Sequence, residues 1–494
     1  MMALHRPSLS RIQPVAWAGL AALLIAALPP LLAGTALVGG CAVLLVLARP
    51  GLGLALLALA VPLGPSVEVM ASGLPLGPTE LLAGLVVASW LAAVLARRRD
   101  RVDFGLLVWP MLAFLGAGLL SASLAESFPS AAKELLRWLE LLLVYVAATS
   151  LLREEADRRI AIGAVLLAGV GEALLGIAQF FTRIGPPSFV IGPFLRAYGT
   201  FGQPNPFAGY LGMILPLAIA LAVCWRPSRR DWLWRLSWVA AALIAAAIGM
   251  SMSRGAWLGV VLGGSVLAVL VSRRAVRFVA WGAGASVLAL LLGAINLLPA
   301  SLTQRVTTAV AYFRIFDARG VYPEPHIWAI VERMAHWQSA WEMLVDHPLF
   351  GVGPGHYVLA YPRYAILPYW EDPLGHAHNF YLHVAAELGI LGLVLYLVMV
   401  GSWLWLGLSL ARRLKGQERQ GFQRAVAVGV VACLTAASAH NLFDNLYVQG
   451  MNVHVALLLG IIASIYGSSG DSGRWPRTES PRPASAPRAE ARGT

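Results

Sequence analysis

The stretch HAHNFYLHVAAELGILG at residues 376–392 carries most of the information about the fold and function of this chain. It places His378 and Asn379 at the start of a strongly apolar helix, directly after the one long polar segment of the sequence. The apolar run continues to about residue 411 and is therefore long enough to cross a bilayer. A titratable histidine where water meets lipid is expensive to keep, so we interpret this stretch as a functional site.

The composition predicts an all-α polytopic membrane protein. Of the 494 residues, 58% are hydrophobic and only 13% are charged, and the mean hydropathy is +0.70. A soluble protein of this length could not bury so many apolar side chains. The three cysteines lie in or beside apolar segments, which argues against a disulfide framework or a zinc site. The net charge of +12 resides in short loops and the tail, as on the cytoplasmic face of a membrane protein, so we expect no nucleic-acid partner.

The apolar runs predict about 12–14 transmembrane helices, an even number that leaves both termini in the cytoplasm. Arginine clusters in alternate loops set this orientation, and the basic, apolar N-terminus reads as a first anchor rather than a cleaved signal. The runs lie near residues 15–29, 31–48, 51–64, 80–96, 104–121, 134–152, 160–181, 206–224, 234–252, 255–271, 278–297, 386–411, 423–442 and 450–467.

These runs divide the chain into four parts. Residues 1–297 form an N-terminal transmembrane bundle, and residues 298–385 form a large extracytoplasmic loop that contains short helices. Residues 386–467 supply the C-terminal transmembrane helices. Residues 468–494, rich in Ser, Pro and Arg, form a disordered cytoplasmic tail. A loop of this length inside a compact protein usually has a function.

Two shorter outward segments hold candidate anion-binding residues. In LRAYGTFGQPNPFAGYL (195–211), Asn205 followed by Pro206 predicts a helix start, with Asn205 as N-cap. Free N–H groups at that start and the nearby Arg196 favour a negatively charged ligand. In GMSMSRGAW (249–257), Arg254 lies at the membrane surface, where an arginine needs a partner. The alternative for both arginines is snorkelling to lipid phosphates.

The long loop adds Arg305 and Arg333 as further cations, and Trp337 and Trp341 are spaced to lie together in the interface plane. His378, with an ordinary pKa near 6.5, is able to take a proton from a hydroxyl group at neutral pH. The alternatives are a structural histidine and a metal site built from His378 and its neighbours His376 and His356. Their spacing matches no standard metal motif.

Three of these segments, in the same order, resemble the O-antigen ligase and O-antigen polymerase superfamily. GTFGQPNPFAGYL (199–211) is similar to the family's G-T-F-x-x-P-N element, and SMSRGAWLG (251–259) to its S-R-G hairpin. His378-Asn379, followed after nine residues by Gly389-x-x-Gly392, resembles its H-N-x9-G-x-x-G pattern. Leu393 and Val394 stand where small polar residues often follow.

The resemblance implies a GT-C-like, metal-independent inverting glycosyltransferase without a cofactor, in the cell inner membrane. Its donor would be a glycan on undecaprenyl pyrophosphate, and its acceptor a hydroxyl of the lipid A core or another glycan. His378 would then be the general base on the periplasmic face. Arg196 and Arg254 would bind the pyrophosphate, with Arg333 or Arg305 as a clamp from the loop. Asn205 and Asn379 would support the site, and Gly389 and Gly392 would allow close helix packing around the lipid tail.

Other functions stay open at this point. A surface-polysaccharide polymerase and a protein O-oligosaccharyltransferase share the motifs and differ in the acceptor, and the single large loop favours a ligase. A lipid-linked glycan transporter would explain Glu172, an ionisable residue in the middle of a span, but would also predict repeated halves. A rhomboid-type protease built on Ser251 conflicts with the number of spans.

Overall fold

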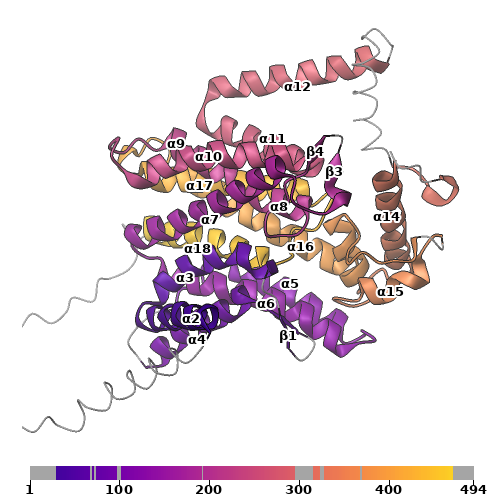
Figure 1. The fold of residues 1–494 in the computed structure, drawn as a ribbon, viewed down its shortest axis with the longest axis horizontal. Helices are drawn as coiled ribbons and strands as arrows, with labels where there is room; N and C mark the ends of the chain where they lie inside the picture. Colours follow the sequence, from indigo (N-terminus) through magenta and orange to yellow (C-terminus); the bar gives the residue numbers. More distant parts are fainter. Residues whose placement is uncertain are drawn as a thin grey trace, which may run out of the picture.

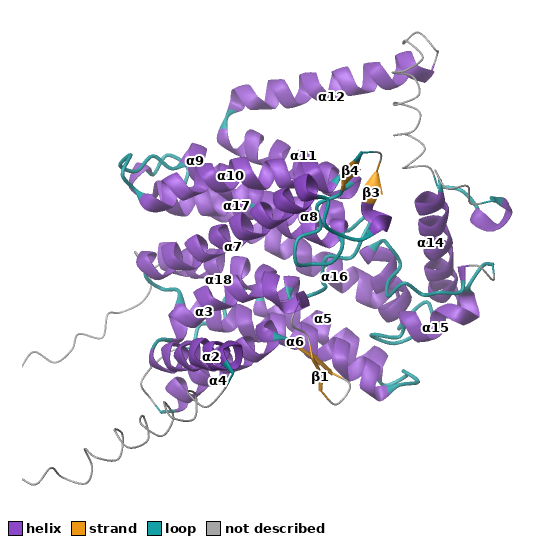
Figure 2. Ribbon diagram, in the orientation of Figure 1, coloured by secondary structure: helices purple, strands orange, loops and turns teal. Residues whose placement is uncertain are grey.

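Helices make up nearly all of the secondary structure (Figures 1 and 2). The structure is a computed structural model and describes residues 29–66, 69–71, 74–96, 102–191, 193–294, 315–322, 327–367 and 370–470. The predicted anchor at 15–28, Arg305 and the tail beyond residue 470 lie outside the described residues. The prediction of an all-α polytopic membrane protein is confirmed.

The N-terminal half begins with helices broken by proline. Pro30 and Pro50 each occupy the first turn of a helix, where a missing N–H costs nothing. The elements in order are α2 (Pro30–Ala48), α3 (Pro50–Ala60), η1 (Val61–Ser66), the antiparallel hairpin β1 (Val69–Ala71) and β2 (Leu74–Leu76), α4 (Pro78–Leu95), α5 (Val108–Ala122), α6 (Phe128–Leu151) and α7 (Glu155–Thr182).

The middle of the chain brings a second small hairpin and the predicted tight turn between two spans. It contains η2 (Pro187–Phe189), the antiparallel pair β3 (Val190–Ile191) and β4 (Phe194–Leu195), α8 (Pro204–Gly212), α9 (Leu215–Cys224), α10 (Trp232–Ser251), α11 (Arg254–Val271) and α12 (Arg273–Ala294). The last part contains η3 (Ala318–Gly320), α14 (Trp328–Asp346), α15 (Tyr357–Tyr364), α16 (Phe380–Arg413), η5 (Glu418–Gln420), α17 (Gly421–His440) and α18 (Met451–Gly470).

Eight helical segments of the described residues are long and apolar enough to span a membrane, fewer than the predicted 12–14. The N-terminal runs give shorter helices because Pro50 divides them. The first half of α6 carries Lys133, Glu134, Arg137 and Glu140, which is more charge than a lipid-embedded helix tolerates. The eight segments are Pro78–Leu95, Glu155–Thr182, Pro204–Cys224, Trp232–Ser251, Arg254–Val271, Phe380–Arg413, Glu418–His440 and Met451–Ser469.

Glycines set the closest helix contact near the site. Gly255, Gly259 and Gly263 form a stripe of small residues along α11 that faces α17. A Cβ on Gly259 would lie 2.5 Å from the carbonyl oxygen of Ala436, so no larger residue fits without moving the backbone. Small residues spaced by four let two membrane helices approach this closely. This contact fixes the C-terminal end of α17 against the N-terminal end of α11.

The helices α14 and α15 lie at one end of the bundle (Figure 1). In Figure 1, α14 runs across the direction of the spanning helices, beyond the ends of α8 and α16. Glu332, Arg333, His336, Glu342 and Asp346 make α14 too polar to cross a bilayer. Its buried residues pack against α15 and the start of α16. The long loop therefore covers the position of His378.

Candidate functional site

The backbone of His378 is held on both sides in an uncommon conformation. Its φ is +52°, in the left-handed region. Its N–H donates to Nδ1 of His376 at 3.1 Å, and its carbonyl accepts from Nε1 of Trp337 at 3.2 Å. Asn379 then caps α16, since its Oδ1 accepts from the N–H groups of Tyr381 and Leu382 at 3.0 and 3.1 Å. The first turn of α16 and the loop before it thus fix where the imidazole lies.

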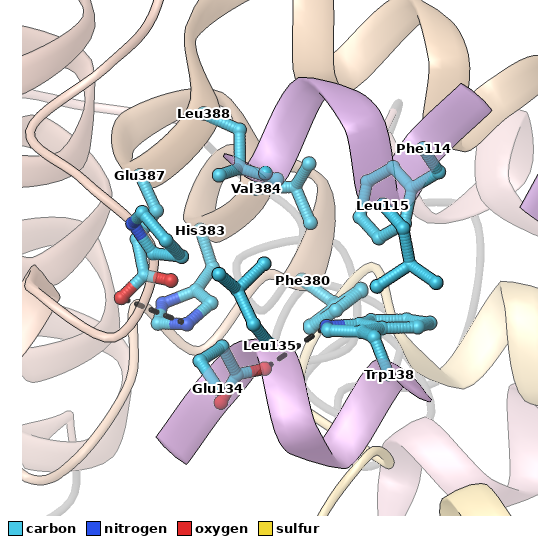
Figure 3. Close-up of a pocket in the computed structure, with 12 residues that line it drawn as sticks. Phe114, Leu115, Glu134, Leu135, Trp138, Phe380, His383, Val384, Glu387 and Leu388 are labelled. Atoms are coloured by element: carbon cyan, nitrogen blue, oxygen red, sulfur yellow. Dashed lines mark hydrogen bonds and ion pairs between the residues drawn. The ribbon is translucent and has the colours of Figure 1, made fainter. Parts of the chain in front are cut away.

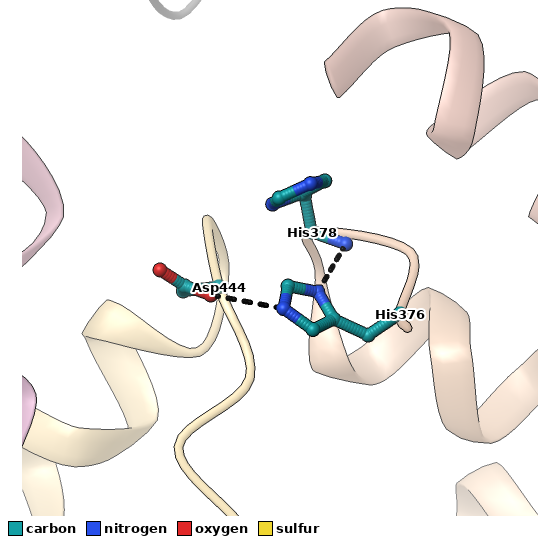
Figure 4. Close-up of side chains that lie close together, drawn as sticks. All are labelled: His376, His378 and Asp444. Carbon is teal, nitrogen blue, oxygen red and sulfur yellow. Dashed lines mark hydrogen bonds and ion pairs between the residues drawn. The ribbon is translucent and has the colours of Figure 1, made fainter. Parts of the chain in front are cut away.

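His376 connects this loop to the turn between α17 and α18. Its Nε2 lies 3.5 Å from Oδ1 of the buried Asp444 (Figure 4). Because Nδ1 of His376 accepts a hydrogen bond, the proton of the neutral ring is on Nε2 and points at the carboxylate. Burial tends to raise the pKa of Asp444, but the surrounding imidazoles and the Asn445 N–H hold it below its ordinary value. Asp444 is therefore a carboxylate at neutral pH.

The imidazole of His378 is neutral and buried among other rings. Burial lowers the pKa of His378 to about 3, and His376 and Arg333 contribute to this lowering while Asp444 opposes it. The ring centroids of His376 and His336 lie 4.5 and 5.3 Å from that of His378. Within the described residues, Nε2 of His378 is buried and has no hydrogen-bond partner. At neutral pH the ring is therefore uncharged, and one of its two nitrogens carries an unprotonated lone pair.

Arg333 supplies positive charge on the α14 side of this cluster. Its side chain is buried, and its guanidinium carbon lies 5.8 Å from the centre of the Phe443 ring. The sequence-predicted clamp from the loop thus lies close to His378.

Arg196 contacts the turn between α10 and α11, and Arg254 follows that turn. The Nε of Arg196 donates to the carbonyl of Ser251 at 2.7 Å, and Arg254 is the first residue of α11 and is exposed. Asn205 does not cap α8 as predicted, because the extended Gln203 takes that position and Pro204 begins the helix. The Oδ1 of Asn205 instead accepts from Arg196 at 3.2 Å and orients that guanidinium.

His440 joins the arginine pair to the histidine cluster. It is buried at the end of α17, and a Cβ on Gly255 would lie 2.7 Å from its Cδ2. Asp444 follows in the next turn and reaches His376. Our sequence analysis missed His440 and Asp444. Their signal is the segment HNLFDN (440–445), which repeats the His-Asn pair of 378–379 at the end of another apolar helix.

A comparison with known protein families finds one family that is similar to part of this chain. Residues 239–397, less than half of the chain, match the O-antigen ligase family. The chain therefore contains a region similar to the O-antigen ligase family. The matched O-antigen ligase domain runs from α10 into α16 and includes Arg254, Arg333 and His378. Arg196, His440 and Asp444 lie outside it, Arg196 in the loop before α8 and the other two at and after the end of α17.

Two further comparisons add little. One solved structure that is similar to this chain is described as "Structural coordination of polymerization and crosslinking by a peptidoglycan synthase complex". The sequence identity is 18% and the TM-score 0.40, with 75% of this chain and 99% of the other covered. No curated protein matches the sequence.

A buried carboxylate shapes the loop of the O-antigen ligase domain beneath His378. The oxygens of Glu387 accept the N–H groups of Gly355 and Tyr357 at 2.8 and 2.9 Å. Figure 3 shows Glu387 beside His383, whose Nε2 lies 3.7 Å from Oε1 of the glutamate, with Glu134 facing them from α6. His383 is therefore part of the support of the loop, one helical turn below the site.

Gly389 lies at a kink in α16, where the loop after α14 contacts the helix. It interrupts α16 with a φ of +67° and a ψ of −168°, and a Cβ there would collide with the backbone of Leu349 and Phe350. The N–H of Ile390 donates to the Pro348 carbonyl at 2.8 Å. Gly392 faces Leu388 of its own helix. Gly389 thus allows the loop after α14 to rest on α16, while the packing role of Gly392 stays a prediction.

Glu172, the residue behind the transporter hypothesis, is hydrogen-bonded to the loop before α8. Its Oε1 and Oε2 accept the hydroxyl and N–H of Thr200 at 2.8 and 3.1 Å. Gln179 on the same helix accepts the N–H of Gly199 at 2.8 Å. These two side chains of α7 hold the GTF segment that carries Arg196, which gives Glu172 a structural role.

His376, His378 and Asp444 also form the one group in the described part of the chain whose ligand atoms are close enough to hold a metal ion. The hydrogen-bond pattern does not suit a metal. An ion on Nε2 of His376 would require the ring proton on Nδ1, and Nδ1 accepts a hydrogen bond from the backbone of His378.

Proposed function

We propose that this protein is an O-antigen ligase-like glycosyltransferase that moves a glycan from undecaprenyl pyrophosphate to a hydroxyl group of the lipid A core or a similar acceptor. The observation that carries the proposal is the buried, unpartnered Nε2 of His378, with Arg333 close enough to act on its charge. A base beside several fixed cations suits a reaction that deprotonates a hydroxyl and releases a phosphate anion.

In the proposed step, the acceptor oxygen attacks the anomeric carbon of the donor sugar. A new C–O bond forms while the bond from that carbon to the pyrophosphate oxygen breaks. The acceptor proton passes to Nε2 of His378, and the electron pair of the broken bond leaves with the lipid pyrophosphate. Attack opposite to the leaving group inverts the anomeric configuration. The step balances with the atoms of donor, acceptor and His378.

The arginines would hold the leaving group. Arg196 and Arg254 lie where the GTF segment meets the start of α11, and a guanidinium binds phosphate oxygens in pairs without losing its charge. Arg333 would reach the same group from α14. A bound pyrophosphate would also raise the pKa of His378 from about 3 towards its ordinary range, because a nearby anion stabilises the imidazolium. The base would thus gain strength only once the donor is in place.

The proposed location is the inner membrane, with His378 on the periplasmic face and both termini in the cytoplasm. The long donor lipid would lie among membrane lipids beside the spanning helices, which the eight apolar segments allow. A polymerase differs in using another lipid-linked glycan as acceptor, and a protein O-oligosaccharyltransferase in using a protein hydroxyl.

The test is transfer from a purified undecaprenyl-pyrophosphate glycan by full-length protein in nanodiscs, with and without lipid A core. His378→Ala should reduce acceptor-dependent transfer by roughly 100-fold or more, since general-base catalysis typically contributes 10²–10⁴. His347→Ala removes an exposed histidine at the end of α14 and should leave the rate unchanged. Chain elongation without lipid A core would indicate a polymerase instead. Full activity of His378→Ala would refute the role of the base.

A further inference from the structure

A cavity of about 500 Å³ is lined by Asn379, the residue that follows His378, and by one face of α14. Its volume falls in the range of roughly 300–1,000 Å³ that small-molecule sites occupy. Two of its lining residues also hold the backbone around His378 in position. Asn379 caps α16 next to His378, and Trp337 donates to the His378 carbonyl. The full lining is Ile315, Phe316, Arg319, Met334, Trp337, Gln338, Trp341, Glu342, Asn379 and Leu382.

One face of α14 forms the main wall of this cavity. Met334, Trp337, Gln338, Trp341 and Glu342 recur with the three- and four-residue spacing of one helical face. Trp341 is 56% exposed, so a large part of its ring is open to a ligand. An indole presents a flat apolar face with partial negative charge, against which the polarised C–H bonds of a pyranose ring can pack.

Charged and amide groups lie next to these aromatic faces. Arg319 and Glu342 form an ion pair at the mouth, with 51% and 39% of their side chains exposed. Gln338 bridges Asp317 and the Ala318 N–H, which ties η3 to α14 and holds Arg319 in place. A sugar needs such hydrogen-bonding groups around its edge. A hydrocarbon chain in the cavity would remove water from this ion pair and offer it no hydrogen bonds, whereas the hydroxyl groups of a sugar would replace that water.

We propose that this cavity is the acceptor subsite and binds sugar rings of a glycan acceptor, with Trp341 stacking against one ring. The inference rests on the proposed function and extends it. The donor would approach from the turn that holds Arg196 and Arg254, and the acceptor from the α14 side, so that the two substrates meet at His378. The cavity thus selects a carbohydrate acceptor in place of a protein hydroxyl or water.

The direct test is binding, which does not depend on catalysis. Full-length protein in nanodiscs would be titrated with core oligosaccharide released from lipopolysaccharide, followed by saturation-transfer NMR. Trp341→Ala should weaken binding roughly tenfold or more, as expected for loss of a central aromatic contact. The matched control is Trp328→Ala on the same helix, since Trp328 is 43% exposed, packs on Trp370 and does not line the cavity.

Three results would overturn the assignment. The first is equal binding by wild type and Trp341→Ala, and the second is no binding by the wild type at millimolar oligosaccharide. The third is quenching of Trp341 by brominated lipids, seen as a difference between wild type and Trp341→Ala, which would make Trp341 a membrane contact.

Activity separates this proposal from the proposed function. In the transfer assay, Trp341→Ala should raise the KM for the acceptor with little change in kcat, and Trp328→Ala should change neither. If the wild type released no lipid pyrophosphate at all, the proposed function would fail, while the binding experiment would still decide whether the cavity holds sugar.

Discussion

At the residue scale, the decisive feature is that one imidazole, His376, controls the position of another. Its Nδ1 accepts the N–H of His378, and its Nε2 faces Asp444. The two ring nitrogens have separate tasks, and amide side chains can replace them one at a time. An asparagine places its oxygen near the position of Nδ1, and a glutamine places its amide near that of Nε2.

Substitution of His376 should therefore separate the two contacts. We expect His376→Asn to keep an acceptor for the His378 N–H and to retain most transfer activity. His376→Gln should lose that acceptor and lower kcat by about tenfold or more, since small misplacement of a base is costly. The measurement is kcat and KM for donor and acceptor in nanodiscs. Equal loss in both variants, together with a lower unfolding temperature, would indicate a merely structural histidine.

The protonation of His378 gives a second prediction at this scale. Burial lowers its pKa to about 3, so the empty protein should keep this ring neutral as the pH falls from 7 to about 5. An ordinary histidine would be mostly protonated by then, with its pKa near 6.5. The measurement is an NMR titration of histidine-labelled protein without donor, with the signal assigned by its absence in His378→Ala. A midpoint near 6.5 would contradict the buried environment described above.

At the scale of elements, the contact between α11 and α17 fixes the distance between the arginine turn and the histidine cluster. Gly255 lies against His440, and Gly259 and Gly263 lie against carbonyl groups of α17. The stripe of small residues thus connects the S-R-G hairpin to the turn that carries Asp444. The sequence predicted the hairpin, but nothing in the spacing of the glycines revealed which helix they would face.

A larger residue in this stripe should disturb both stability and activity. We expect Gly259→Val to destabilise the protein by about 1–3 kcal/mol, because the added side chain would push α11 away from the Ala436 carbonyl. Gly264→Val on the same helix is the control, since a Cβ there would have no described heavy atom within 4 Å. Thermal unfolding in nanodiscs and the transfer rate are the measurements. Identical melting of the two variants would show that the helices do not depend on this contact.

At the scale of the whole molecule, the sequence predicted the fold class and the segments of the site, but not their assembly. His378, Arg196, Arg254 and Arg333 were recognisable because they stand in polar segments between apolar runs. The predicted N-cap at Asn205 was wrong, because α8 already begins at Pro204. Gly389 contacts the loop at 348–350, which the sequence did not predict. His440 and Asp444 were missed, because two buried polar residues at the end of an apolar helix do not change its hydrophobic pattern.

The arrangement of α16 makes the topology testable. This helix runs from Phe380 to Arg413, so its two ends should lie on opposite sides of the membrane. In a cysteine-free background, a cysteine at the exposed Leu374 should react with a membrane-impermeant maleimide added to spheroplasts. A cysteine at the exposed Lys415 should react only after permeabilisation. Labelling of both from outside would contradict the predicted orientation.

The contribution of the α17–α18 turn has a consequence for protein engineering. Exchanging the loop between α12 and α16 for that of a relative would transfer three residues with proposed roles together: His378 as base, Trp341 as sugar contact and Arg333 as clamp. It would leave behind Asp444 and Arg196, which come from other parts of the chain. Such a chimera would combine the histidine of the relative with the native Asp444 and Arg196. Grafts intended to change acceptor choice should therefore carry residues 440–447 along with the loop, and a soluble fragment of the loop alone should be catalytically inert.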